Sequence, residues 1–186
     1  MDSINKKLTR KNINYCSDDY FKVKSLYEEA FPKIERYEYD SLFSLCETGK
    51  AELYAYFDSA VFVGFSFDFF DEDYDYLFYF ATKSELRNKG YGSQMLRMIV
   101  DAAGDKTVVL DIEPADERAD NFEQRKHRAS FYERRGFTAS DYEMVDETGH
   151  FRVYSNNAAK FTAEKFKKLW TIFPEAFDGT ELVLVK

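Results

Sequence analysis

The stretch "ATKSELRNKGYGSQMLRMIV", residues 81–100, decides the fold of this chain. An apolar, strand-like run leads into it, and apolar residues at helical spacing follow. Between these two patterns lie Gly90 and Gly92, beside the cations Arg87 and Lys89. Glycine lets the backbone approach a ligand closely, and a helix N-terminus favours negative charge. The stretch therefore predicts a phosphate site at the point where a strand becomes a helix.

Two common phosphate loops do not fit this stretch. A Walker-type loop requires lysine directly after its last glycine, but Ser93 follows Gly92. A dinucleotide-binding fingerprint requires a third glycine, and Met95 stands in that position. The fingerprint also turns tightly off its strand, whereas residues 83–89 separate the strand from Gly90. Both of these phosphate sites are therefore disfavoured.

Two signatures resemble those of the GNAT acetyltransferases. The segment "RNKGYG", residues 87–92, resembles their pyrophosphate loop, whose pattern is Arg/Gln-x-x-Gly-x-Gly/Ala. The segment "RASFYERRGF", residues 128–137, resembles their second signature and matches it at Ala129, Tyr132, Gly136 and Phe137. The strand, loop, helix, strand, helix and strand between them also follow the family order. The resemblance covers residues 20–155 and implies one GNAT domain over residues 1–186.

The residue pattern itself predicts an α+β domain. Helices are expected within residues 16–32 and 37–49, with Ser17 capping the first and Phe21 on its buried face. Strands at 51–58, 61–70 and 76–82 then form an antiparallel meander. The remaining expected elements, in chain order, are a helix from Met95 to Ala103, a strand at 106–113, a helix at 121–137, a hairpin at 137–156, and a short helix and strand within 163–186. The resemblance implies a mixed, mostly antiparallel sheet, flanked by helices and splayed at a cofactor cleft between the strands at 76–82 and 106–113.

The resemblance implies acetyl-CoA as cosubstrate and assigns its contacts. Main-chain groups of Phe80, Ala81 and Thr82 would face the pantetheine arm. The pyrophosphate would be wrapped by the loop that consists of Arg87, Asn88, Lys89, Gly90, Tyr91, Gly92 and Ser93.

Transfer of an acetyl group to an amine needs a proton acceptor and a proton donor. By resemblance, Tyr132 would be the general acid that protonates the departing thiolate. Glu113, at the end of a strand, is the first choice for the general base, because partial burial would raise its pKa towards a useful value. Asp111, Tyr79 and a water relay without a dedicated base are weaker alternatives.

One position departs from the family pattern. The second signature often carries asparagine three residues before its alanine, and this chain has Lys126 there. A cation at that position would reach the phosphates or the adenosine of the cofactor, or belong to a solvated helix face. Neither His127 nor His150 has a partner pattern that suggests a metal, so no metal is expected.

Composition limits the partners and the compartment. With 26 basic and 34 acidic residues the net charge is −8, which argues against nucleic acid and anionic membranes as partners. The acidic turn at residues 70–75 is typical of a solvated turn, but would also attract a cationic amine. Cys16 and Cys46 are expected to be buried thiols, and residues 1–12 lack a signal-peptide core, so we expect a cytoplasmic protein.

The sequence thus predicts a cytoplasmic N-acetyltransferase that uses acetyl-CoA and acts by direct attack in a ternary complex. Its acceptor would be a primary amine of a small molecule, a peptide or a protein, and the fold is compatible with a homodimer. The alternative is a catalytically silent CoA-binding module of the same fold that serves as a sensor or an interaction domain.

Overall fold

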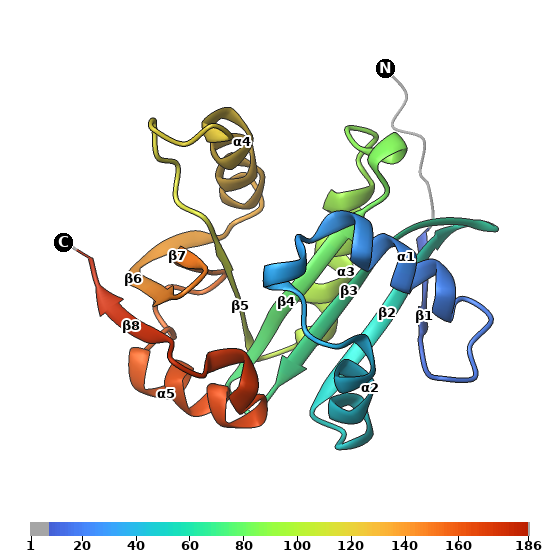
Figure 1. The fold of residues 1–186 in the computed structure, drawn as a ribbon, viewed down its shortest axis with the longest axis horizontal. Helices are drawn as coiled ribbons and strands as arrows, with labels where there is room; N and C mark the ends of the chain where they lie inside the picture. Colours follow the sequence, from blue (N-terminus) through green and yellow to red (C-terminus); the bar gives the residue numbers. More distant parts are fainter. Residues whose placement is uncertain (1–7, 186) are drawn as a thin grey trace. The chain divides into compact units, whose positions relative to one another are not determined.

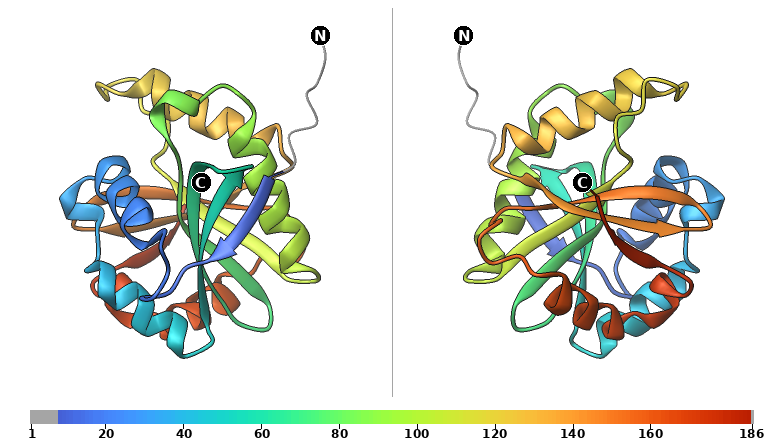
Figure 2. Two further views of the ribbon diagram at one scale, coloured as in Figure 1. Left: turned by 90° about the vertical axis from the view of Figure 1, so that its right-hand side faces the viewer. Right: turned by 90° about the vertical axis from the view of Figure 1, so that its left-hand side faces the viewer.

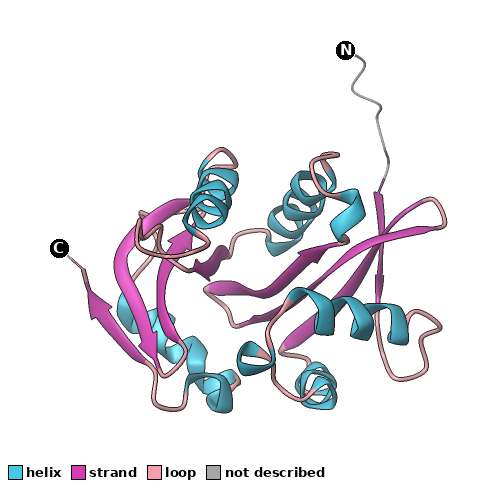
Figure 3. Cartoon of the chain, turned by 45° about the horizontal axis from the view of Figure 1, so that its top comes forward, coloured by secondary structure: helices cyan, strands magenta, loops and turns pink. Residues whose placement is uncertain are grey.

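The structure is a computed structural model, and it describes residues 8–185. The chain divides into two compact units. Unit 1 comprises Met1–Phe69 and Phe78–Gly104, and unit 2 comprises Phe70–Leu77 and Asp105–Lys186. Within the described residues, five α-helices accompany eight strands that hydrogen-bond in the order β1-β2-β3-β4-β5-β7-β6-β8. Figure 3 distinguishes the helices from the strands by colour. The α+β class expected from the sequence is confirmed.

Unit 1 is built from an antiparallel sheet with helices on both faces. Its elements are β1 (Leu8–Asn12), α1 (Tyr20–Ala30), α2 (Tyr39–Glu47), β2 (Ala51–Asp58), β3 (Val61–Phe70), the second half of β4 (Tyr74–Thr82) and α3 (Tyr91–Ala103). In Figures 1 and 2, α1 and α2 lie on one face of strands β2–β4 and α3 lies on the other. Because both faces are covered, seven consecutive residues of β3 are buried, and its inner aromatic side chains are Phe65, Phe67 and Phe69.

A glycine in β3 permits unusually close packing inside unit 1. A Cβ atom placed on Gly64 would lie 2.3 Å from the Ala81 carbonyl oxygen and 2.9 Å from Cε of Met95. The absence of a side chain therefore lets β4 and α3 approach β3 from two directions.

The first helix differs from the expectation at two residues. Its N-cap is Asp19, while the Ser17 hydroxyl accepts a hydrogen bond from the Asn14 backbone N–H at 2.9 Å. The helix therefore begins later than expected, and Phe21 falls on its outer face with 77% of its surface exposed. The buried residues are instead Val23, Leu26 and Tyr27, so the prediction of an inward Phe21 was wrong.

Strand β1 was not expected from the sequence. It pairs antiparallel with β2, from Leu8 opposite Asp58 to Asn12 opposite Tyr54. Only Leu8 of its five residues is buried, so the strand carries no apolar alternation. An edge strand of this kind is defined by its pairing partner rather than by its own residues. Residues 1–7, part of the stretch without a signal-peptide core, lie outside the described residues.

Unit 2 combines the first half of β4 with the elements after α3. These are β5 (Thr107–Ile112), α4 (Phe122–Glu133), β6 (Thr138–Asp146), β7 (Gly149–Ser155), α5 (Ala163–Leu169) and β8 (Glu181–Leu184). Strands β4 and β5 are parallel, with Tyr74–Tyr76 opposite Thr107–Val109, while β5–β7, β6–β7 and β6–β8 are antiparallel. The splay at a cofactor cleft stays a prediction.

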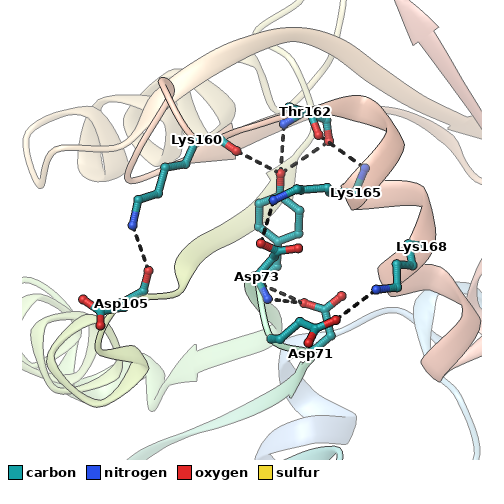
Figure 4. Close-up of polar contacts among 9 residues, drawn as sticks. Asp71, Asp73, Asp105, Lys160, Thr162, Lys165 and Lys168 are labelled. Carbon is teal, nitrogen blue, oxygen red and sulfur yellow. Dashed lines mark hydrogen bonds and ion pairs between the residues drawn. The ribbon is translucent and has the colours of Figure 1, made fainter.

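The C-terminal segment, residues 160–185, contacts the acidic turn at residues 70–75 within unit 2 (Figure 4). Lys165 Nζ contacts Asp73 Oδ1 at 2.7 Å, and Lys168 Nζ contacts Glu72 Oε1 at 3.1 Å. The Tyr74 hydroxyl accepts a hydrogen bond from the Thr162 N–H at 2.9 Å. The cationic amines at this turn are therefore lysines of the chain itself.

Three further observations bear on the sequence predictions. Of the helices in residues 8–185, none combines the length and the apolar character needed to cross a membrane. Cys16 is exposed and Cys46 is half-buried, so the expectation of two buried thiols was wrong for Cys16. Burial raises the pKa of the Cys46 thiol to about 12.

Candidate active site

The loop between β4 and α3 turns through two left-handed residues. Asn88 has φ 60° and Gly90 has φ 85°, and Gly90 is the N-cap of α3. Asparagine and glycine are the residues that adopt this conformation at the lowest cost. Left-handed residues occur in turns whose backbone N–H groups can line an anion site.

The charge around this loop favours an anion as well. Arg87 and Lys89 are exposed on either side of Asn88. The first-turn N–H groups of a helix lack intrahelical acceptors, and α3 has 13 residues whose dipoles add to the positive end. The backbone conformation and the side-chain charges at the start of α3 therefore both favour a bound anion.

A tyrosine inside the loop pattern anchors the start of α3. Tyr91 is buried, and its hydroxyl donates a hydrogen bond to Asp58 Oδ2 at 2.7 Å. Sequence reasoning missed this contact, because the pattern leaves the residue between the two glycines undefined. The Tyr91 side chain therefore holds the loop to the end of β2 within unit 1.

The strand that leads into the loop also belongs to unit 1. Ala81 is buried, whereas Phe80 and Thr82 are half-buried. The chain leaves β4 with a hydrogen bond from the Lys83 N–H to the Val63 carbonyl at 3.0 Å, and a short 3-10 turn, Ser84–Leu86, follows. Gly92 and Ser93 are half-buried in the first turn of α3. All the residues expected to bind the cofactor, apart from Lys126, therefore lie within residues 80–93 of unit 1.

Tyr132 lies in unit 2, on the buried side of α4. It is 7% exposed, and burial raises the pKa of its hydroxyl. The Asp111 carboxylate raises this pKa further, while the Arg128 guanidinium lowers it. The phenol is therefore held in its protonated form, which is the form that a proton donor needs.

The rest of the second signature explains how α4 ends. The Tyr132 carbonyl accepts hydrogen bonds from the N–H groups of Arg135 and Phe137, at 2.9 and 3.2 Å. Gly136 has φ 85°, so the chain can reverse there, and the ring of Phe137 lies 5.8 Å from that of Tyr132. These residues fix the position of Tyr132 through local structure.

Glu113 is held by two arginines of α4. Arg125 Nη2 lies 2.5 Å from Glu113 Oε1, and Arg128 Nη1 lies 3.4 Å from Oε2. Arg125, Arg128 and Tyr132 are three and four residues apart, so they share one face of the helix. Glu113 therefore ties the face that carries Tyr132 to the end of β5.

The remaining predicted residues have distinct surroundings. Tyr79 is 3% exposed and donates a hydrogen bond to the Glu35 carbonyl at 2.7 Å, and burial raises the pKa of its hydroxyl. Lys126 is an exposed residue of α4 in unit 2, with its nearest acid, Glu123, at 4.0 Å. Among residues 8–185 no group of three or more His, Cys, Asp or Glu side chains could hold a metal ion.

Comparison with known proteins places these features in a family context. Residues 49–139 match the family described as "Acetyltransferase (GNAT) domain". No curated protein matches the chain. A Bacteroides thetaiotaomicron structure assigned to the GNAT acetyltransferases has a TM-score of 0.74 at 23% identity and covers 90% of this chain and 98% of its own.

Two further structures were solved with ligands. Arabidopsis thaliana Naa50, in complex with the bisubstrate analogue CoA-Ac-MVNAL, has a TM-score of 0.61 at 15% identity over 80% of this chain and 97% of its own. An aminoglycoside 6'-N-acetyltransferase complexed with coenzyme A has a TM-score of 0.62 at 14% identity over 79% and 95%. At these sequence identities the structural similarity establishes the fold alone.

Proposed function

The chain belongs to the GNAT superfamily through the domain at residues 49–139, and we propose that it is an N-acetyltransferase. It would transfer the acetyl group of acetyl-CoA to a primary amine by direct attack in a ternary complex. The observation that carries the proposal is the loop of residues 87–93. This loop combines two left-handed residues, two exposed cations and the N-terminus of α3.

The charge and the backbone conformation of the loop support binding of the pyrophosphate of coenzyme A. Arg87 would bind phosphate oxygens through its planar guanidinium, and the turn at Asn88–Gly90 would supply N–H groups. Phe80, Ala81 and Thr82 would bind the pantetheine arm through main-chain groups, as the family resemblance implies. Lys126 would contribute charge for the phosphates or the adenosine.

Tyr132 would act as the general acid for the departing thiolate. Its raised pKa keeps the phenol protonated until the sulfur gains negative charge. For the general base, Glu113 remains the prediction made from sequence, although both of its oxygens are engaged by arginines. Asp111 and a water relay remain the alternatives, whereas the buried Tyr79 hydroxyl is committed to a backbone carbonyl.

Proteins of similar fold support an amine as the acceptor. Structures of this fold include the bisubstrate complex of Naa50, the ribosomal-protein-S18-alanine N-acetyltransferase of Escherichia coli and the aminoglycoside enzyme. These three proteins are named for, or bound to, a peptide analogue, a ribosomal-protein alanine and an aminoglycoside. We therefore propose that the acceptor is an amine of a peptide, a protein or a small molecule.

The first test is replacement of Tyr132 by phenylalanine. We expect kcat for thiol release from acetyl-CoA to fall about 100-fold or more, since a positioned acid contributes about 10²–10⁴-fold. The rise in melting temperature that acetyl-CoA produces should be unchanged, because the donor site keeps its contacts. Rates are measured with a panel of amines, peptides and proteins.

A matched variant, Tyr154→Phe, controls for the loss of a buried hydroxyl in unit 2. Tyr154 is 6% exposed on β7 and has no proposed role in the reaction. Equal loss of turnover in the two variants would mean that Tyr132 is structural. Binding of acetyl-CoA without turnover on any acceptor would instead favour the silent CoA-binding module.

A further inference from the structure

An arginine of unit 1 has a buried guanidinium nitrogen without a hydrogen-bond partner. Arg36 is half-buried and follows a 3-10 turn, Lys33–Glu35, in the connection between α1 and α2. Its Nε atom is buried and makes no hydrogen bond. Within residues 8–185, its side chain takes part in no hydrogen bond or ion pair. An unpaired buried donor costs free energy, so a ligand that supplies the missing acceptor would bind favourably here.

The outer end of this guanidinium is accessible. Nη1 and Nη2 of Arg36 also lack a partner among the described residues, but neither atom is buried. The group therefore has one buried nitrogen and two that reach the surface. Arginine binds a carboxylate through two parallel N–H donors of its planar group, and the accessible end offers such a pair.

Two buried tyrosines hold the backbone on both sides of Arg36. The Tyr79 hydroxyl donates a hydrogen bond to the Glu35 carbonyl at 2.7 Å, and the Tyr27 hydroxyl donates one to the Tyr37 carbonyl at 2.9 Å. The Tyr37 N–H donates to the Tyr79 hydroxyl at 3.4 Å. Tyr27 is 1% exposed and Tyr79 is 3% exposed. The main chain immediately before and after Arg36 is therefore fixed from within unit 1.

The positive charge of Arg36 lies close to one of these phenols. Burial raises the pKa of Tyr27 to about 12, whereas its hydrogen bonds with Tyr79 and Tyr37 and the charge of Arg36 lower it. The chain as a whole carries a net charge of −8 and repels anions. A carboxylate would therefore bind only where a cation compensates its charge locally, as Arg36 can.

The loop of Arg36 is held to the strand that leads into the proposed donor site. Tyr79 belongs to β4 and directly precedes residues 80–82, whose main chain we propose binds the pantetheine arm. The Tyr37 ring lies 5.9 Å from that of Phe78 on the same strand. These residues all belong to unit 1. Arg36 is therefore positioned by the strand segment next to the arm that would carry the acetyl group.

We propose that Arg36 binds a carboxylate of the acceptor, so that the acceptor is an amine that also carries a carboxylate, as an amino acid or a short peptide does. Tyr27 and Tyr79 are positioning residues for this guanidinium. The inference rests on the proposed acetyltransferase function and narrows its acceptor. Arg36 would hold the carboxylate through paired N–H donors and leave the amine free to attack the thioester.

The experiment compares acceptors with and without the carboxylate. The common L-amino acids and a set of dipeptides are each tested beside their C-terminal carboxamides, and kcat/KM is measured by thiol release from acetyl-CoA. Amidation of an amino acid lowers the pKa of its α-amine, so more of the carboxamide is in the reactive neutral form. A preference for the acid therefore cannot come from the basicity of the amine. The dipeptides distinguish a peptide carboxylate from that of a free amino acid.

The variants are Arg36→Ala, Arg36→Lys and Tyr79→Phe, with Lys33→Ala as the control. Lys33 is an exposed cation at the start of the same turn, so its loss removes an equal charge nearby. Tyr79→Phe keeps the ring and removes the hydroxyl that holds the Glu35 carbonyl. The acetyl-CoA melting shift is recorded for every variant.

We expect the wild-type chain to favour the acid over its carboxamide by about 10–100-fold, the effect of one charge-assisted pair. Arg36→Ala should abolish most of this preference by raising KM for the acid, and should change kcat/KM for the carboxamide by about threefold or less. Arg36→Lys should keep part of the preference, because it retains the charge without the planar group. Tyr79→Phe should raise KM for the acid about fivefold at an unchanged kcat. Lys33→Ala should keep the full preference, and no variant should alter the acetyl-CoA melting shift.

Several outcomes would overturn the inference. Equal losses with acid and carboxamide in Arg36→Ala would make Arg36 structural, and a smaller acetyl-CoA melting shift would assign it to the cofactor. The same loss of preference in Lys33→Ala would indicate a general effect of charge. A wild-type chain that favours carboxamides, or amines without a carboxylate, would contradict the inference and leave the acetyltransferase function standing. If the wild-type chain binds acetyl-CoA but releases no thiol with any acceptor, the proposed function fails, and this inference fails with it.

Discussion

Replacing Gly64 with alanine is expected to destabilise the protein by about 3 kcal/mol, at the upper end of the usual cost of overpacking. The new Cβ would lie 2.3 Å from the Ala81 carbonyl oxygen, a distance that real Cβ contacts do not reach. The nearest obstacle is backbone, so β4 must move away from β3. Chemical denaturation measures the loss as a lower midpoint at an unchanged slope.

The same substitution should also weaken acetyl-CoA binding, because Ala81 leads directly into the proposed donor loop. Gly49→Ala is the control, since Gly49 has φ 70° but no atom within 4 Å of its added Cβ. Its expected cost is about 1 kcal/mol, from backbone strain alone. A Gly64→Ala protein no less stable than Gly49→Ala would contradict the close approach of β3 and β4.

Replacing Phe166 with alanine is expected to cost about 3–5 kcal/mol, the usual range for a fully buried phenylalanine. Phe166 is 0% exposed and packs against the rings of Tyr74, Tyr76, Phe161 and Trp170. Its loss leaves a cavity beside Tyr76. Thermal unfolding measures the effect as a lower melting temperature.

The control for this substitution is Phe21→Ala in unit 1. Phe21 is 77% exposed, so its removal should change stability by about 0.5 kcal/mol or less. A small effect at Phe166 would mean that the C-terminal segment does not pack on Tyr76 as described. Phe166 lies outside residues 49–139, so its contact with Tyr76 is not contained within the matched family domain.

The sequence predicted most of the fold because its signals are local. The glycines at 90, 104 and 136 lie where positive φ values occur at helix ends, and the aromatic runs of β2 and β3 form the expected antiparallel hairpin. The two GNAT signatures then supplied the order of the elements between them. Helix α3 and the central strand β5 therefore occupy the expected stretches of sequence.

The features that sequence reasoning missed depend on contacts between distant residues. Phe21 and Val23 are both apolar, and only the start of α1 at Tyr20 decides which of them faces the core. The hydrogen bond from Tyr76 to Asp111 spans 35 positions, and that from Tyr91 to Asp58 spans 33. The sequence gives Glu113 a position at the end of a strand. The two arginines that contact its carboxylate come from the next helix, so its position along the strand does not reveal them. No periodicity or short motif encodes these pairs.

The central claim is that residues 87–93 bind acetyl-CoA, and titration calorimetry tests it most directly. We expect Arg87→Ala to weaken binding about 10–100-fold, since a hydrogen bond to a charged group contributes about 1.5–3 kcal/mol. Gly92→Glu should weaken it further by placing a negative charge at the N-terminus of α3. Arg97→Ala removes the same charge from an exposed position later in α3 and should change Kd by about threefold or less. Equal effects of Arg87→Ala and Arg97→Ala, or no binding of acetyl-CoA by the wild-type chain, would contradict the claim.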